Sequence, residues 1–589
     1  MNDKGEKTMN VVESAEKALT GYPSIDKPWL KYYSEEAIHV TFPKAMVYEC
    51  IYKNNCDHGN EIAMIYYGKK ITYRKLFAEI DKAARAFTAL GVKSGDNVAI
   101  CMPAVPEALY TVLALNKIGA NANMLNPTFS EEQLAERITE TGAKILVVLN
   151  ELYGKIGKVV PKTSIATIVA CPAVNSFGKI VRMWKHAGNI PGTMDWNAFV
   201  RRGKGMAYTA FKYQPNTPAV TVYSSGTTGA AKGIQLTNDG IVATMRQYEC
   251  AGFHMKREDR YIAQIPIWFS TGISVTMLVP LYLGITLILE PVYDFALIAK
   301  DVLKYKPNFL ISAMGLFEYM KKNYPRSDAY GAFKYAAVGG EYVAPRVEQE
   351  YNKWLKANGC KEGLHKGYGM CECGGTVTFS TSVCNVVGSS GIPMPSVVVA
   401  AFDPCTDKEL PYGKRGEIRV LTPCRMLGYY KKPQETEKYL KTDPSGKVWA
   451  CTGDMGYVAE DGNIYVDGRI SDSYVNDDGE TVYLFDIERA VLDVPQIRQC
   501  KAVSGCIDGR KTHICHMVLT EDADVDETLD AVRRYCTEKL PASHQPVAVR
   551  LYGEALPVAP SGKLDIKAMK ENTDELIYLE NGKIEEDEC

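Results

Sequence analysis

The chain has 589 residues, with 68 Lys and Arg against 70 Asp and Glu, which gives a formal net charge of −2. At about 100–200 residues per domain, this length predicts several domains, or one large domain with smaller ones. Without a basic excess, binding to nucleic acid or to an anionic membrane is not indicated. The 46% hydrophobic and 23% charged residues are typical of a globular protein and exclude the disordered and fibrous classes.

No secretory or membrane-spanning segment is indicated. Residues 1–15 are polar and charged and lack the apolar run of a signal peptide. The most apolar stretch, Ile273–Leu289, is interrupted by Pro280 and Gly284, and it predicts a buried helix followed by a strand over Ile285–Leu289. The 17 scattered cysteines indicate reduced thiols. We therefore expect a cytoplasmic protein with no integral membrane segment and no nucleic-acid partner.

The first half of the chain alternates between helical and strand patterns. Apolar residues recur with a helical period over Tyr73–Leu90, and Glu107–Ile118 is a second predicted helix. Short apolar runs at Asn97–Met102 and Lys144–Leu149 predict buried strands. Strands separated by helices of this length imply parallel sheets and an α/β architecture.

A predicted strand over Ala219–Tyr223 leads into a loop, Ser224–Gly233, that is rich in glycine and hydroxyl residues. Glycines let the backbone approach an anion closely, and the amide groups, the hydroxyls and Lys232 can bind phosphate oxygens. The spacing is not that of the P-loop NTPases. The loop predicts phosphate binding, with a flexible turn of the same composition as the alternative.

Further motifs lie before and after this loop, along residues 70–565. Their order resembles that in the adenylate-forming superfamily, which includes acyl-CoA synthetases, peptide-synthetase adenylation domains and luciferases. In the glycine-rich loop, Ala231 stands where that family usually has proline. The motifs besides the loop are Ile71-Thr-Tyr-x-x-Leu76, Gly91-x-x-x-Gly-Asp96, Lys117-x-Gly119, Asn126-Pro127, Gly339-Gly-Glu341, Tyr368-Gly-Met-Cys-Glu372, Gly413-x-x-Gly-Glu417, Gly428-Tyr429, Thr452-Gly-Asp454, Asp467-Gly-Arg469 and Pro557-x-x-x-Ser-Gly-Lys563.

The resemblance implies that ATP reacts with a carboxylic acid to form an acyl-adenylate and pyrophosphate, with coenzyme A as co-substrate. Positive charge must gather where two anions meet, and Lys563 is the implied source of it. Glu372 and Thr228 are the implied Mg²⁺ ligands, since magnesium prefers one or two protein oxygens together with substrate phosphates. The implied catalytic residues are therefore Lys563, Thr228 and Glu372.

The resemblance also implies a nucleotide site. Tyr368 would stack on adenine beside Val466, while Asp454 would accept the ribose hydroxyls with Arg469 nearby. The implied nucleotide-binding residues are Ser224, Ser225, Gly226, Thr227, Thr228, Gly229, Lys232, Gly340, Glu341, Tyr342, Tyr368, Gly369, Asp454, Val466, Arg469 and Lys563.

The resemblance implies a large N-terminal domain over residues 1–470, built of parallel and mixed sheets flanked by helices. A small mobile α+β cap would follow over residues 471–572 and carry Lys563, with Ser471 as the hinge between the two. Relatives usually have Asp or Lys at the hinge, and their loop corresponding to Tyr474–Glu480 is shorter, so the sequence favours adenylation over thioester formation. Cys371 stands where relatives usually have threonine, which predicts a weaker contact to phosphate. The remaining residues, 573–589, are predicted to be an acidic, solvated tail.

The segment after Pro266 lacks the histidine that many relatives have and reads as an apolar wall for the acyl group. Glycines just after Glu372 would leave room in this pocket. The candidate pocket residues are Trp268, Phe269, Thr271, Gly272, Gly374 and Gly375. A hydrophobic acid, and a fatty acid first, is the predicted substrate.

An AMP-forming acyl-CoA synthetase, an acid–thiol ligase of fatty acid metabolism, is the leading interpretation. A stand-alone adenylation enzyme that loads a carrier protein is the first alternative, and a catalytically silent nucleotide-binding homologue is the second. Retention of the four residues Lys563, Glu372, Asp454 and Arg469 argues against the silent homologue. The expected partners are the acid, ATP and coenzyme A, and the assembly to test is a homodimer.

Overall fold

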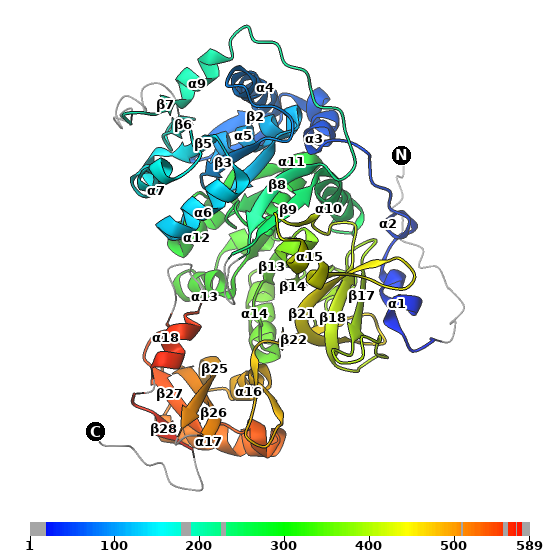
Figure 1. Cartoon of the computed structure of the whole chain (residues 1–589). Helices are drawn as coiled ribbons and strands as arrows, with labels where there is room; N and C mark the ends of the chain where they lie inside the picture. Colours follow the sequence, from blue (N-terminus) through cyan, green and yellow to red (C-terminus); the bar gives the residue numbers. More distant parts are fainter. Residues whose placement is uncertain are drawn as a thin grey trace.

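The computed structural model describes residues 19–177, 190–224, 231–507, 510–557, 564–572 and 574–579. Two large sheets flanked by helices make up most of the first 395 residues, a smaller antiparallel sheet follows, and a separate unit ends the chain (Figure 1). The predicted α/β fold with a small C-terminal α+β unit is confirmed. Within the part of the chain that the structure describes, no helix is both long and apolar enough to cross a bilayer.

The first large sheet has eight strands in the order β19-β9-β8-β4-β3-β5-β6-β7. From β8 to β7, each strand runs parallel to its neighbour. At the other edge, β9 is antiparallel to both β8 and β19. The strands are β3 (Asn97–Cys101), β4 (Asn121–Met124), β5 (Ile145–Leu149), β6 (Thr167–Cys171), β7 (Met194–Asp195), β8 (Pro218–Tyr223), β9 (Gly233–Thr237) and β19 (Gly428–Tyr429).

The second large sheet has nine strands in the order β16-β15-β14-β13-β12-β10-β11-β1-β2. Its central strands, from β14 to β1, are parallel, so their carboxyl ends meet at one edge. The strands are β1 (Ile62–Tyr66), β2 (Lys69–Thr72), β10 (Arg260–Ala263), β11 (Thr286–Leu289), β12 (Phe309–Ser312), β13 (Tyr335–Gly339), β14 (Leu364–Tyr368), β15 (Thr378–Phe379) and β16 (Ile392–Pro393).

Helices cover these sheets and pack with them in one large core and two smaller ones. In α4 (Tyr73–Ala89) the apolar residues that predicted the helix, Leu76 and Ile80 among them, are fully buried. The other main helices are α3 (Val47–Asn55), α5 (Pro106–Ile118), α6 (Glu131–Thr141), α10 (Asn238–Cys250), α12 (Phe295–Tyr305), α13 (Met314–Asn323) and α14 (Pro345–Ala357). The predicted order of helices and strands over residues 73–149 is thereby confirmed.

The apolar stretch after residue 270 is buried and not a membrane span. It forms a π-helix over Thr271–Leu278, then α11 (Val279–Leu283), and ends in β11. Gly284, at φ +82, ends the helical part, and β11 joins the centre of the second sheet. The predicted buried helix followed by a strand is confirmed.

A third, antiparallel sheet follows, with the strands β17 (Val398–Phe402), β18 (Gly416–Leu421), β20 (Leu440–Thr442), β21 (Val448–Val458) and β22 (Ile464–Arg469). The short helix α15 (Pro433–Tyr439) lies between β19 and β20 along the chain. β21 and β22 pair so that Asp454 lies opposite Arg469. The predicted boundary between residues 470 and 471 falls in the turn after β22.

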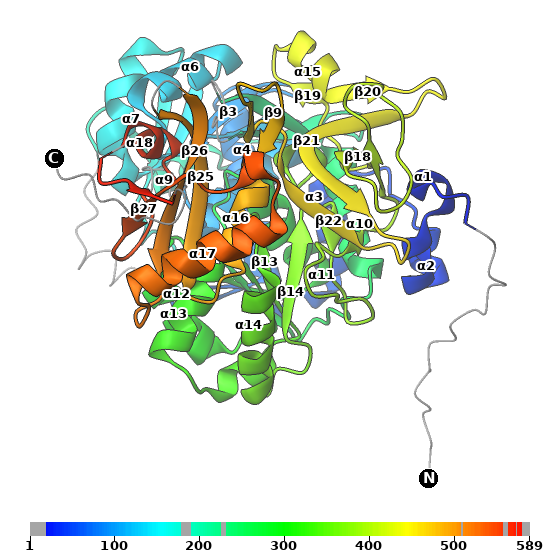
Figure 2. The same cartoon turned by 90° about the horizontal axis from the view of Figure 1, so that it is seen from below.

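The C-terminal unit has its own core and lies beneath α14 and β22 in Figure 1; Figure 2 shows α17 crossing it from below. A hairpin, β23 (Ser473–Val475) and β24 (Thr481–Tyr483), precedes a four-stranded sheet and its helices. These elements are α16 (Leu484–Leu492), β25 (Ile497–Ile507), β26 (Arg510–Leu519), α17 (Val525–Lys539), β27 (Ala548–Tyr552), α18 (Ile566–Glu571) and β28 (Ile577–Tyr578).

The end of the chain departs from the predicted acidic tail. β28 pairs with β27, and Leu579 is buried in the core of the C-terminal unit. The apolar run Leu576–Leu579 explains this, because it completes the sheet despite the acidic residues around it. The predicted start of the tail at residue 573 is therefore too early, and residues 580–589 lie outside the described part.

Candidate active site

The carboxyl ends of the parallel strands β12, β13 and β14 meet at one edge of the second sheet. β13 ends at Gly339, whose partner Gly367 immediately precedes Tyr368 at the end of β14. Ligands of open parallel sheets bind beyond these carboxyl ends. The third sheet approaches the same edge, since Asp454 of β21 contacts Tyr368.

Three of the predicted nucleotide-binding residues form one cluster. The Tyr368 hydroxyl donates a hydrogen bond to Asp454 Oδ2 at 2.5 Å, and Arg469 Nε lies 2.9 Å from Asp454 Oδ1. The Asp454 side chain is only 7% exposed, whereas that of Arg469 is 56% exposed. Burial raises the pKa of the Asp454 carboxyl, and the Arg469 charge and the Tyr368 hydroxyl oppose this shift. The cluster presents a buried carboxylate suited to accept two hydroxyl hydrogens.

The backbone around this cluster is held by further hydrogen bonds. Arg469 Nη1 donates to the carbonyl of Thr452 at 2.9 Å, and the Asp454 amide donates to Thr452 Oγ1 at 3.0 Å. Thr452 in turn donates from Oγ1 to the carbonyl of Ile418 at 2.6 Å. The Thr-Gly-Asp motif is therefore locked to two neighbouring strands, which fixes the direction of the carboxylate.

Glu372 lies in the 3₁₀ turn Cys371–Cys373 just after Tyr368. Its Oε1 accepts a hydrogen bond from the Tyr429 hydroxyl at 2.9 Å, and its carbonyl accepts one from the Met426 amide at 2.7 Å. Glu372 is also close enough for its charge to raise the pKa of Asp454. The predicted metal ligand thus lies beside the predicted ribose site.

The described ends of the glycine-rich loop close on each other. The Lys232 amide donates to Ser224 Oγ, and the Ser224 amide donates to the Lys232 carbonyl, each at 3.0 Å. Lys232 Nζ lies 4.8 Å from the centre of the Tyr429 ring. The loop residues Ser225, Gly226, Thr227, Thr228 and Gly229 lie outside the described residues, as does Lys563.

The segment after β13 carries the next three predicted residues. Gly340 has φ +84, a left-handed conformation that favours glycine, and it turns the chain away from the sheet. Glu341 Oε1 accepts a hydrogen bond from the Met314 amide at 2.5 Å, and burial raises the pKa of this carboxyl. The Tyr342 side chain is half exposed, and Val466 of β22 is partly buried against the large core.

The chain is similar over most of its length to known proteins. A family model described as "AMP-binding enzyme" matches residues 52–430. The chain belongs to this AMP-binding family. Among its relatives are long-chain-fatty-acid–CoA ligases of Escherichia coli O6:H1, 26% identical with 86% of this chain and 91% of that protein covered, and of Bacillus subtilis, 26% identical with 91% and 96% covered.

Solved structures agree with the family assignment at the level of the fold. The anthranilate CoA ligase AuaEII in complex with anthranoyl-AMP has a TM-score of 0.76 at 20% identity, and covers 90% of this chain and 98% of its own. ATP-bound MatB from Rhodopseudomonas palustris has a TM-score of 0.76 at 22% identity, with 89% and 98% covered. The predicted adenylate-forming fold is confirmed.

The AMP-binding family member has closely packed glycines where the acyl pocket was predicted. A Cβ on Gly272 would lie 1.9 Å from the Pro266 carbonyl oxygen, and one on Gly375 would lie 3.0 Å from Thr271 Cα. Gly374 approaches Cys424 in the same way. In the described structure, a side chain at any of these glycines would meet a neighbouring segment.

The aromatic residues of the predicted pocket, Trp268 and Phe269, are partly buried, with ring centres 6.3 Å apart. Thr271 Oγ1 lies 3.4 Å from the Gly375 carbonyl, so the two halves of the predicted pocket are in contact. An apolar wall at this place agrees with a hydrophobic acid, and the pocket residues stay a prediction.

Two residues of the site were not assigned a role from the sequence. Tyr429 contacts both Glu372 and Lys232, although its motif, Gly428-Tyr429, was part of the resemblance. Arg489 of α16 lies over Tyr342 and donates to the Val466 carbonyl at 2.7 Å. Neither contact can be read from local sequence, because each joins residues far apart in the chain.

Ser471, the predicted hinge, is exposed in the turn between β22 and β23. The turn is closed by the Asp472 amide, which donates to the Arg469 carbonyl at 2.9 Å, and Lys501 Nζ lies 3.2 Å from Asp472 Oδ2. An ion pair therefore lies one residue after the predicted hinge. Ser471 stays a predicted hinge.

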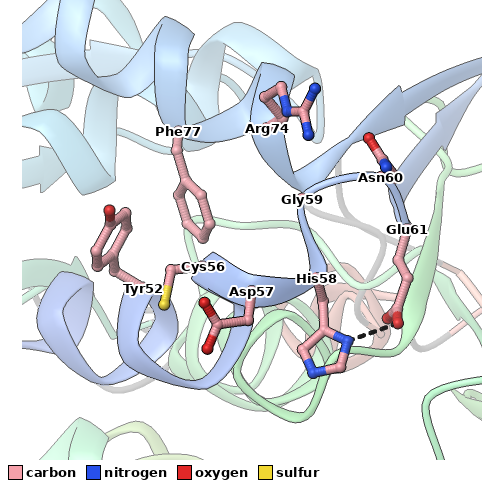
Figure 3. A pocket seen from close by; sticks show the side chains of 9 residues that line it. All are labelled: Tyr52, Cys56, Asp57, His58, Gly59, Asn60, Glu61, Arg74 and Phe77. Carbon is pink, nitrogen blue, oxygen red and sulfur yellow. Dashed lines mark hydrogen bonds and ion pairs between the residues drawn. The ribbon is translucent and has the colours of Figure 1, made fainter.

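A cavity of about 380 Å³ opens on the surface between the 3₁₀ turn Cys56–His58 and α4 (Figure 3). A His58–Glu61 pair, with Nδ1 and Oε1 2.7 Å apart, lies at its rim. None of the predicted nucleotide or substrate residues lines it, so it is separate from the candidate site. Its lining residues are Tyr52, Cys56, Asp57, His58, Gly59, Asn60, Glu61, Arg74 and Phe77.

Proposed function

We propose that this AMP-binding family member is an AMP-forming acyl-CoA synthetase whose substrate is a hydrophobic carboxylic acid, with a fatty acid as the first candidate. The observation that carries the proposal is the Tyr368–Asp454–Arg469 cluster with Glu372 beside it, at the carboxyl edge of a parallel sheet. The long-chain-fatty-acid–CoA ligases among its relatives support the choice of acid and of coenzyme A as acceptor.

The reaction has two steps. A carboxylate oxygen of the acid attacks the α-phosphorus of ATP, the bond to the bridging oxygen breaks, and pyrophosphate leaves. The sulfur of coenzyme A then attacks the acyl carbonyl carbon, its proton is released, and AMP leaves with the electron pair of the broken bond. Tyr368 would offer its ring to adenine, and Asp454 would accept the ribose hydroxyls.

The donor set at Glu372 fits magnesium. In the described part of the chain, no group of three or more His, Cys, Asp or Glu could hold a metal ion. A lone carboxylate that shares the ion with phosphate oxygens is the arrangement that Mg²⁺ prefers. Glu372, with Thr228 of the glycine-rich loop, would hold the ion, which when bound neutralises charge on the phosphates.

Lys563 is the proposed source of positive charge at the α-phosphate, on the strength of its motif. A cytoplasmic location is also proposed, because many cysteines scattered along a chain are typical of reduced thiols.

The test is pyrophosphate release from ATP and Mg²⁺ over a panel of carboxylic acids, with and without coenzyme A, followed by mass spectrometry of the products. We expect acid-dependent release and an acyl-CoA product. Lys563→Ala should abolish release, whereas Lys567→Ala, an exposed lysine four residues later, should leave it unchanged. An acyl-adenylate that does not react with coenzyme A would instead support loading of a carrier protein.

A further inference from the structure

A five-residue segment, Met426–Tyr430, connects two parts of the candidate site. At one end the Met426 amide donates to the Glu372 carbonyl at 2.7 Å. At the other end the Tyr430 amide donates to the carbonyl of Gly233, the last residue of the glycine-rich loop, at 2.7 Å. Between them, β19 pairs with β9, with Tyr429 opposite Ile234. The segment therefore ties the loop to the turn that carries Glu372.

Tyr429 lies at the centre of this connection. Its hydroxyl donates to Glu372 Oε1 at 2.9 Å, and its ring lies under Lys232 Nζ at 4.8 Å. The neighbouring Tyr439 ring packs edge-on against the Tyr429 ring, with the ring centres 5.9 Å apart and the planes at 72°. The Tyr429 amide donates to Thr436 Oγ1 at 2.9 Å. The ring is buried, so its position is determined from several sides.

The geometry leaves one oxygen of Glu372 available. Among the described residues, Oε2 of Glu372 takes part in no hydrogen bond or ion pair, while Oε1 is held by Tyr429. A carboxylate that binds a metal through one oxygen needs its plane fixed, and a hydrogen bond to the other oxygen does this. The same ring also attracts the Lys232 ammonium, which keeps that charge near the carboxylate.

We propose that Tyr429 is a positioning residue that orients the Glu372 carboxylate toward a divalent cation bound with ATP and that sets the spacing between Glu372 and Lys232. The role rests on the proposed function, because the cation is expected here only if ATP binds. Tyr429 touches neither the cation nor the reacting atoms and acts through Glu372.

The experiment measures binding of Mn²⁺ and ATP to the full chain without acid or coenzyme A, by paramagnetic resonance of free Mn²⁺ and by calorimetry. In Tyr429→Phe the ring stays and the hydroxyl is lost, so the dissociation constant for Mn²⁺ in the presence of ATP should rise about tenfold, as for other partners of metal ligands. The affinity for ATP in EDTA should change less than about twofold, since the ring still lies under Lys232. If Tyr429 contributed to folding alone, Tyr429→Phe would weaken the binding of Mn²⁺ and the binding of ATP in EDTA to the same extent.

Tyr430→Phe is the matched control. It removes the hydroxyl of the next residue, which accepts a hydrogen bond from Asn97 Nδ2 at 3.4 Å and not from Glu372. This variant should leave Mn²⁺ affinity unchanged. In a Glu372→Gln background, Tyr429→Phe should have no further effect, because its partner is already altered.

Equal Mn²⁺ affinity in Tyr429→Phe and the unmodified chain would overturn the positioning role, as would an additive effect in the double variant. Both outcomes leave the proposed function intact. Failure of the unmodified chain to bind ATP at all would instead overturn the proposed function and the role of Tyr429 with it. Thermal melting of each variant shows that the comparison is between folded proteins.

Discussion

The guanidinium of Arg489 lies over the ring of Tyr342, with its central carbon 4.7 Å from the ring centre. Arg489 belongs to α16 in the C-terminal unit, and it also pairs with Asp467 and donates to the Val466 carbonyl. Tyr342 and Val466 are both predicted to contact adenine. The C-terminal unit therefore contacts the rim of the predicted nucleotide site in this arrangement.

Removal of this contact should loosen the C-terminal unit. In Arg489→Ala the chain loses hydrogen bonds from a charged group, each of which contributes about 1.5 kcal/mol or more. We expect limited proteolysis near Ser471 to become at least about tenfold faster, the effect of losing one such bond, because cleavage follows the population of the open arrangement when opening is fast. Gel densitometry against time measures the rate.

Arg533→Ala is the control for this variant. Arg533 lies in the same unit and, among the described residues, forms an ion pair only with Asp530 one helical turn away, in an exposed position. Its loss should leave the cleavage rate near Ser471 unchanged. Equal rates for both variants would show that Arg489 does not hold the two units together.

The buried carboxylate of Asp454 gives a second prediction. Asp454→Asn keeps the size of the side chain but replaces one acceptor oxygen with a donor, so one ribose hydroxyl loses its partner. The KM for ATP should rise about tenfold, the cost of one hydrogen bond to a charged group. Pyrophosphate exchange at varied ATP measures this, with the exposed Asp478→Asn as control. An unchanged KM in Asp454→Asn would exclude the ribose contact.

Local patterns predicted the helices, the strands and the clustered motifs because each depends on residues close in sequence. The helical period over residues 73–90 became α4, and the motifs that hold Tyr368, Asp454 and Arg469 meet in space as the resemblance implies. Neither the Tyr429–Glu372 nor the Arg489–Tyr342 contact has a local signal, since the partners are 57 residues apart in the first and on different units in the second.

At the C-terminal tail and at the glycines after Glu372, residue composition did not predict the local structure. The acidic residues after 571 hid the apolar run that forms β28. The glycines after Glu372 read as open space, yet they are positions of close backbone approach. A glycine in sequence does not distinguish room for a ligand from contact with another chain segment, because both require the absence of a Cβ.

Gly369 shows the difference and gives a third prediction. A Cβ at this position would lie 1.9 Å from the Gly375 carbonyl oxygen, so the segment between Tyr368 and Glu372 would have to move. Gly369→Ala should therefore raise the KM for ATP at least about tenfold, because a misplacement of about 1 Å costs far more than a lost surface contact. Gly154→Ala, with open space around its Cβ, is the control and should have no effect on this constant. Equal constants would mean that the segment adapts without cost.

A pair of acids outside the site gives the last prediction. Glu290 follows β11, is 7% exposed and faces Asp301 of α12. Burial, and then Asp301, raises its pKa from 4.5 to about 9. Above pH 4.5 the unfolded chain releases this proton, whereas the folded chain keeps it up to about pH 9. The contribution of Glu290 to the free energy of unfolding therefore falls as the pH rises from 4.5 to about 9, and it stays constant at higher pH.

Glu290→Gln removes this dependence, because the amide is neutral at every pH and can donate to Asp301 as the protonated acid does. Relative to the unmodified chain, the variant should be of similar stability at pH 5 and more stable at pH 8, by up to about 1.4 kcal/mol for each pH unit of the interval. Urea midpoints at the two pH values measure the difference, and the exposed Glu258→Gln should show none. If the variant and the unmodified chain lost stability equally between pH 5 and pH 8, Glu290 would not be the group that holds the proton.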